Sequence, residues 1–172
     1  MWSIPMKPAA LALAIGLAIA LPAPMAAAED ASDMDFRGVA GVRVTASPLS
    51  PAAADCNLTA EPLVRDMQQH LTDKGLKAAA NSDVVATITV LSSYEPNHGM
   101  CSSAVMLGTY KKASFFDRDA GWLRTGYVVV WQSGLVTLSP PEQHLAEVRD
   151  AARRLGTAMA EEWRKANLAT TN

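Results

Sequence analysis

Three histidines are the side chains of this chain best suited to acid–base chemistry or to binding a metal ion. They are His70, His98 and His144. Imidazole titrates near neutral pH and is the commonest metal ligand in proteins. No two of the three have the four-residue spacing of a helical metal site, and the sequence His-Glu-x-x-His does not occur. We therefore predict no metal ligands, no cofactor and no catalytic residues. A metal site built in space from His98, His144 and a carboxylate is the open alternative.

Two acidic residues flank an arginine in the sequence Asp117-Arg118-Asp119. Paired carboxylates can transfer protons or bind calcium. The same residues are also frequent in turns, because they hydrogen-bond to nearby backbone and stay hydrated. The turn role is the simpler explanation. A Gly-x-Ser-x-Gly motif, which would indicate a serine hydrolase, does not occur.

The first 28 residues predict a secretory signal peptide. Lys7 precedes an apolar run over residues 9–21, and small residues up to Ala28 precede the acidic pair Glu29-Asp30. A basic start, an apolar middle and a small-residue cleavage site are the three parts of such a peptide. The apolar run is shorter than the roughly 20 residues that a membrane-spanning helix needs. We expect a periplasmic or secreted protein with no stable membrane span after cleavage; an uncleaved anchor is the alternative.

Cys56 and Cys101 are the two cysteines of the chain. Cysteine pairs in exported proteins usually form disulfides, because the compartments that they enter are oxidising. Two reactive thiols are the alternative, but the pair lacks a Cys-x-x-Cys spacing. We expect one structural disulfide between Cys56 and Cys101.

The charge of the chain argues against nucleic acid as a partner. The formal net charge is −2 at pH 7, and no run of five or more like charges occurs. Nucleic-acid surfaces and polybasic membrane contacts both need clustered lysine and arginine. The sequence therefore predicts no nucleic-acid binding.

Three stretches of alternating apolar residues predict the strands that position these side chains. They cover residues 84–91, 101–116 and 122–137, and turn-forming residues join them at 95–99 and 117–121. Residues branched at Cβ with a period of two are typical of strands. Consecutive strands with short connections form an antiparallel meander. A further short strand is predicted within residues 38–46.

Two amphipathic helices complete the predicted fold. The first follows Thr59 and ends before Gly75, where a left-handed residue is expected to close it. The second starts at Ser139, with a proline in its first turn, and runs for about 25 residues. Its apolar residues recur every three or four positions.

We predict an α+β fold with a four-stranded, mainly antiparallel sheet. Both helices cover one face, and the order of elements is β-α-β-β-β-α. Residues 38–167 form this single domain. A flexible leader at 29–37 precedes it, and a disordered tail at 168–172 follows it.

The second face of the predicted sheet is the candidate interaction face. With the helices on one face, the other should be polar, yet six large apolar residues are expected on it: Val85, Leu91, Val105, Leu107, Val129, Trp131. A contiguous exposed apolar patch marks a contact site. An envelope protein partner or a second copy in a homodimer would cover it, and burial within the fold is the alternative.

Residues that begin or end the predicted helices and strands follow one another in a fixed order along the chain. The segment 56–59 opens a helix that ends at Gly75. After this helix come Cys101, a strand that contains Val-Val-Trp131, and an amphipathic helix near Trp163. This pattern resembles a group of small uncharacterised bacterial periplasmic proteins. The resemblance implies this fold and an exported location, and it implies no activity. The topology is also similar to that of small envelope-assembly proteins, although the chain lacks the lipid-accepting cysteine of envelope lipoproteins.

These features together predict an exported periplasmic accessory or interaction protein. It would hold a partner through the face or an edge of its sheet. The alternative is a small periplasmic hydrolase or metal-binding protein, which would use the turns at 95–99 and 117–121 together with a histidine. We favour the first prediction, because no catalytic motif supports the second.

Overall fold

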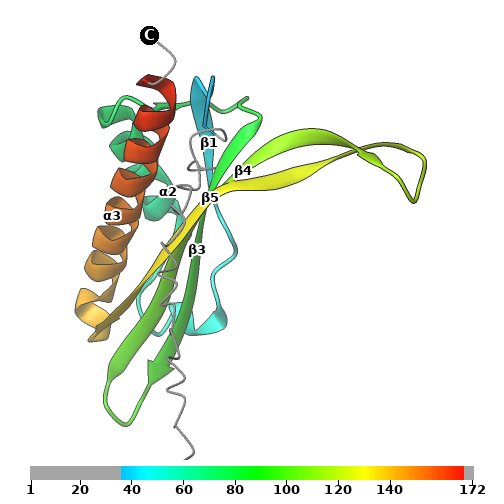
Figure 1. The fold of residues 1–172 in the computed structure, drawn as a ribbon. Coiled ribbons are helices and arrows are strands. Elements are labelled where there is room, and N and C mark those ends of the chain that lie inside the picture. The colour runs from blue at the N-terminus through cyan, green and yellow to red at the C-terminus, as the bar shows by residue number, and fades with distance from the viewer. Residues whose placement is uncertain (1–35, 169–172) are drawn as a thin grey trace, which may run out of the picture.

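The structure is a computed structural model, and it describes residues 36–168. The predicted signal peptide at 1–28 lies outside the described residues, as do most of the predicted leader and tail. The elements, in chain order, are β1 (Gly41–Ala46), a short 3-10 helix η1 (Pro51–Ala53), α2 (Ala60–Asp73), β2 (Lys77–Ala78), β3 (Val84–Glu95), β4 (Met100–Asp117), β5 (Trp122–Ser139) and α3 (Pro141–Leu168) (Figure 1).

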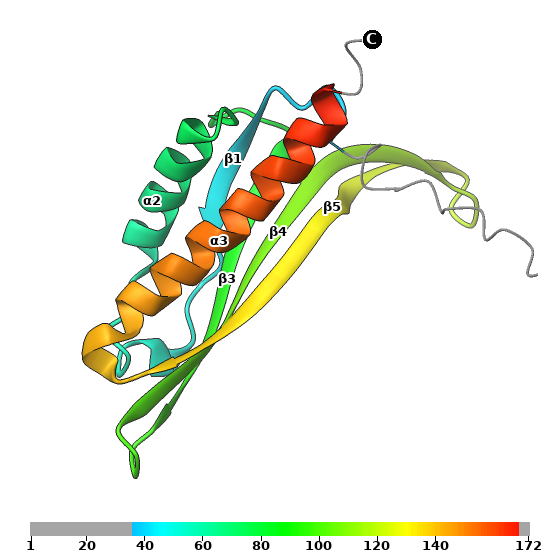
Figure 2. The ribbon, with the colours of Figure 1, turned by 60° about the vertical axis from the view of Figure 1, so that its left-hand side comes forward.

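A five-stranded mixed sheet forms one layer of the fold, and α2 and α3 form the other (Figure 2). The strand order is β2-β1-β3-β4-β5. β1 is parallel to β2 and β3, whereas β3, β4 and β5 form the predicted antiparallel meander. The α+β class is confirmed, but the prediction of four mainly antiparallel strands was wrong. The missed strand, Lys77–Ala78, is two residues long, too short to show any alternation.

α2 ends at the position that the sequence predicted. Gly75 has a φ of +92°, the left-handed conformation expected of a residue that closes a helix. Its N–H donates to the carbonyl of Thr72 at 2.9 Å, and the N–H of Leu76 donates to the carbonyl of Leu71 at 2.9 Å. Leu76 is fully buried beyond this turn. The glycine thus ends the helix and directs the chain into β2.

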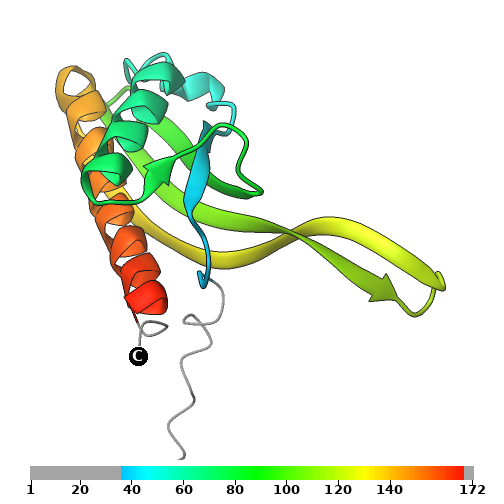
Figure 3. The same ribbon diagram turned by 90° about the horizontal axis from the view of Figure 1, so that it is seen from above.

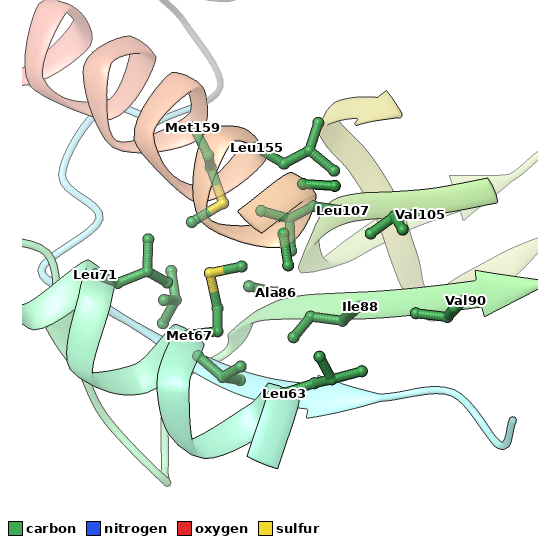
Figure 4. Packing of buried hydrophobic residues seen from close by; sticks show 14 of the residues in the cluster. Leu63, Met67, Leu71, Ala86, Ile88, Val90, Val105, Leu107, Leu155 and Met159 are labelled. Carbon is green, nitrogen blue, oxygen red and sulfur yellow. The ribbon is translucent and has the colours of Figure 1, made fainter. Parts of the chain in front are cut away.

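The core lies between the two helices and the sheet face that they cover (Figure 4). Its labelled members come from α2, α3, β3 and β4: Leu63, Met67, Leu71, Leu155, Met159, Ala86, Ile88, Val90, Val105, Leu107. Amphipathic spacing places one stripe of each helix against the sheet. The ion pair between Arg149 of α3 and Asp66 of α2 links the helices at the edge of this core.

Three residues of the candidate interaction face, Val105, Leu107 and Trp131, were assigned to the wrong side of the sheet. Val105 and Leu107 are 0% exposed, and Trp131 packs against the core. The register explains this, because Val105 pairs with Val90 and Leu107 pairs with Ile88. Directly opposite residues on neighbouring strands share a face. Val105 and Leu107 therefore join the core.

The other face of the sheet, which we call the outer face, points away from the helices. Val85, Tyr110 and Val129 lie there side by side in one row across β3, β4 and β5. Val85 and Val129 were placed on this face by the sequence, as was Leu91. Val85 is buried on it, whereas Leu91 and Val129 are exposed.

The predicted disulfide is confirmed. Cys56 and Cys101 are bonded, their Cα atoms are 5.8 Å apart, and both residues are fully buried. The bond ties the segment after η1 to the first residues of β4, at the end of the sheet where Ser139 pairs with Cys101. It fixes the long connection between β1 and α2 to the sheet.

The first and last described segments meet at the opposite end of the molecule. Phe36 is fully buried, and its carbonyl accepts a bond of 3.0 Å from the side chain of Asn167. The Asn167 side chain in turn accepts a bond of 3.1 Å from the N–H of Gly38. The indole of Trp163 donates to the carbonyl of Val39 at 2.7 Å. We call this group of contacts the terminal clasp.

The β4–β5 hairpin extends well beyond the rest of the sheet. β3 pairs with β4 only as far as Lys111, and beyond it β4 pairs with β5 alone. A bulge between Thr109 and Tyr110 marks the point of departure, and bulges bend and twist the strands that contain them. Figures 1 and 3 show the hairpin curving away from both layers. We call residues 110–129 the arm.

In the part of the chain that the structure describes, no helix combines the length and the apolar character needed to cross a membrane.

Candidate functional site

The structure places the three histidines on separate elements. His98 is exposed in the turn between β3 and β4, His70 lies on α2, and His144 lies in the first turns of α3. Within residues 36–168, no group of three or more metal-capable side chains comes together. The turns at 95–99 and 117–121 lie at opposite ends of β4, which spans 18 residues, or roughly 60 Å. The two turns therefore cannot share a site.

His144 is enclosed in a chain of serine hydroxyls. It is 0% exposed, and its Nδ1 lies 2.7 Å from the Oγ of Ser139. Its Nε2 lies 2.7 Å from the Oγ of Ser103, which is 2.8 Å from the Oγ of Ser92. The Ser139 hydroxyl thus binds this imidazole, and α3 begins only at Pro141, two residues later than predicted. Since the ring is closed to solvent, the arrangement ties α3 to the sheet and offers no accessible nucleophile.

The pKa values of two histidines are lowered from the ordinary value of 6.5. Burial lowers the pKa of His144, and the nearby carboxylate of Glu147 only partly opposes this. Burial also lowers the pKa of His70, with further lowering from Lys74 and Arg153. The Nε2 of His70 bonds to the Thr157 hydroxyl at 3.0 Å. Both imidazoles are therefore neutral in the folded protein at pH 7.

We predict that the protein loses stability as the pH falls below 6.5. Near pH 8, well above 6.5, these histidines are neutral in both states and contribute no pH dependence. Below pH 6.5 the unfolded chain binds protons that the fold excludes, so the free energy of unfolding falls by up to about 1.4 kcal/mol per pH unit for each such histidine. Urea unfolding between pH 8 and pH 5 measures this slope. A His144→Gln variant should show a shallower slope, and an unchanged slope would contradict the assignment to His144.

Asp117, the first residue of the acidic pair, has a structural role at the tip of the arm. One oxygen of Asp117 accepts bonds of 3.0 Å from the N–H groups of Asp119 and Ala120. Its other oxygen lies 2.8 Å from the Nε of Arg124. These three contacts of the Asp117 carboxylate hold the turn, as the simpler sequence interpretation expected.

The arm exposes most of the large apolar side chains that the described surface carries. Those within it are Phe115, Phe116, Trp122, Leu123, Tyr127, Val128 and Val129. Apolar patches on monomeric proteins rarely exceed a few hundred Å², and larger ones mark contact sites. A two-stranded hairpin is also only marginally stable alone in water. The arm is therefore the part of this surface best suited to contact a partner.

The two faces of the arm differ in how their apolar groups are covered. On the face that continues the helix side of the sheet, the guanidinium of Arg124 lies 6.0 Å from the ring centre of Trp122, and the ring of Phe115 lies over Gly126. On the face that continues the outer face, Phe116 pairs with Leu123 and Lys112 pairs with Tyr127. This outer arm face has no such covering contacts among the described residues.

A shallow, open depression of about 350 Å³ lies on the outer face where the arm begins, and we call it the cavity. Val85 forms part of its lining, together with the rings of Tyr110 and Tyr127. Arg43 and two threonines complete it, and Arg43 makes no ion pair within residues 36–168. A volume of this size accommodates a bulky side chain or a small ligand.

The sequence interpretation included Val129 in the interaction face but missed the arm. The predicted strands at 101–116 and 122–137 are twice as long as the predicted strand at 84–91. That difference in length was the available signal, because strands can pair only over their common length.

No protein-family model matches the chain, and no curated protein matches it. Three chains of solved structures match. One of them belongs to a PelC dodecamer from Paraburkholderia phytofirmans; it is 14% identical, the match covers 67% of this chain and 82% of that one, and the TM-score is 0.42. A likeness at this level carries no argument about function or assembly.

Proposed function

We propose that this is an exported, periplasmic accessory protein that binds a partner protein through its arm. The observation that carries the proposal is the exposed apolar surface of a two-stranded hairpin that pairs with no third strand among the described residues beyond Lys111. The Cys56–Cys101 disulfide is compatible with an oxidising, extracytoplasmic location.

The composition of the arm supports protein binding. Tyrosine, tryptophan and phenylalanine are enriched at protein interfaces, since each supplies a large contact area at a small cost in side-chain entropy. The arm also has two unpaired edges, and a partner strand could extend its ladder. A partner would thus bury apolar groups and satisfy backbone groups at once.

Site-specific photo-cross-linking in the exporting cell tests the proposal. A photoreactive phenylalanine analogue in place of Phe116 is expected to give one discrete adduct. The same analogue in place of Val136, which is 79% exposed at the other end of β5, should give none. Mass spectrometry of the adduct identifies what is bound, whether a different protein or a second copy of this chain.

Equal labelling at Phe116 and Val136, or no adduct at either position, would refute arm-mediated binding. The alternative of a small hydrolase or metal-binding protein remains an untested prediction, and nothing among the described residues adds a site for it.

A further inference from the structure

The outer arm face carries a pattern that fits a second copy of itself. From the tip towards the base, its rows are Phe116 with Leu123, Ser114 with Thr125, Lys112 with Tyr127, and Tyr110 with Val129. Bulky apolar groups thus occupy both ends, and small hydroxyl groups lie near the middle. When two such faces meet in opposite directions, the apolar tip of each lies on the apolar base of the other.

We propose that two copies of the chain associate through their outer arm faces, with the arms antiparallel. Phe116 and Leu123 of one copy would enter the cavity beside Tyr110 and Tyr127 of the other. This inference rests on the proposed function and specifies its partner. The contact is self-complementary, as a twofold interface requires, because the same surface serves both copies.

The exposed area of this face matches what a dimer interface uses. Phe116, Leu123, Tyr127 and Val129 are 60%, 72%, 58% and 56% exposed. Taking about 150–220 Å² for each side chain, they expose roughly 450 Å² of apolar surface. A standard interface buries about 800 Å² per partner, of which a little over half is apolar. The apolar area exposed on one outer arm face is therefore about equal to the apolar area that one partner buries in a standard interface.

The cavity at the base of the arm provides the second half of the contact. Its 350 Å³ accommodates a bulky apolar side chain, and anchors of this kind dominate binding energy when they fill a pocket.

The other arm face is less suited to this contact. The Arg124 guanidinium covers the Trp122 ring and is held by Asp117, so packing a second arm there would bury an ion pair. Removing a charge pair from water is costly unless further bonds compensate. The outer arm face has only Lys112 as a charged group, at its edge with Tyr127.

The first test is the oligomeric state of the mature, oxidised protein. Sedimentation velocity between about 1 and 100 μM is expected to show a concentration-dependent dimer. The double substitution Phe116→Ser and Leu123→Ser should weaken dimerisation at least tenfold, as expected for interface anchors. Val136→Ser, on the same face but outside the arm, should leave it unchanged. Circular dichroism confirms that each variant is folded.

The second test reads the orientation of the arms. Protein with Leu123→Cys is mixed with protein with Thr87→Cys, whose side chain lines the cavity, and mildly oxidised. A disulfide between the two variants is expected. Replacing the second with Val136→Cys should abolish it. The native disulfide is fully buried, so it should not exchange under these conditions.

A wild-type protein that stays monomeric over this range, or a dimer that survives loss of Phe116 and Leu123, would overturn the inference. A dimer that forms no disulfide between the Leu123→Cys and Thr87→Cys variants would overturn the antiparallel orientation of the arms. If the protein is monomeric while photo-cross-linking at Phe116 captures a different protein, the proposed function stands and the second copy is the wrong partner. If neither occurs, both fail.

Discussion

Removal of the Cys56–Cys101 disulfide is expected to lower the free energy of unfolding by about 4 kcal/mol. The bond joins residues separated by 45 positions, and closing a loop of that length restricts the unfolded chain by this amount in the chain-entropy model. Domains of this size are stable by about 5–15 kcal/mol in total. The bond therefore supplies a large part of the stability of the fold.

The double substitution Cys56→Ala and Cys101→Ala is the suitable variant. It leaves no free thiol, and alanine suits a fully buried position. Urea unfolding of the oxidised wild type and the double variant should differ by about 2–5 kcal/mol, with a melting temperature lowered by roughly 10–15 °C. If the two proteins unfold at the same urea concentration, other contacts already restrain this loop.

Replacement of Leu107 by glutamate should prevent folding, whereas the same replacement at Val129 should leave the fold intact. Leu107 is fully enclosed between β4 and the helices, and Val129 is 56% exposed on the outer face. A carboxylate at position 107 would be buried without a partner, at a cost of several kcal/mol added to the lost packing. Val129→Glu changes the surface only, and such changes usually stay within about 0.5 kcal/mol.

A milder pair of variants keeps this comparison quantitative. Leu107→Ala should cost about 2–5 kcal/mol, since it leaves a cavity in the core. Val129→Ala should cost far less. Urea unfolding of both variants and the wild type measures these losses. If the two variants lose similar free energies of unfolding, the register of β4 is not as described.

The sequence predicted best those features that depend on local chemistry. Gly75 closes α2 because few other residues adopt its left-handed conformation without strain. The disulfide followed from the cysteine count and the expected compartment. The buried residues of α2, which are Leu63, Met67 and Leu71, recur every four positions, as an amphipathic helix requires.

Features that depend on long-range contacts could not be predicted from the sequence. In β4, Val105 and Leu107 alternate with Ala104 and Met106, so both faces read as apolar. Which set is buried depends on where α3 packs, and the period-two pattern alone does not decide it. The cavity beside Tyr110 and Tyr127 likewise arises only when the register brings β1, β3 and the arm together.

The terminal clasp determines how the protein would respond to a mechanical load. The buried Phe36 and the last turn of α3 are joined at one corner by three hydrogen bonds, those of Asn167 to Phe36 and Gly38 and that of Trp163 to Val39. The disulfide lies at the other end of the sheet, where Cys101 pairs with Ser139. A force that pulls the two ends of the domain apart would therefore peel the clasp open first, while the sheet, and the arm that it supports, would still be in place.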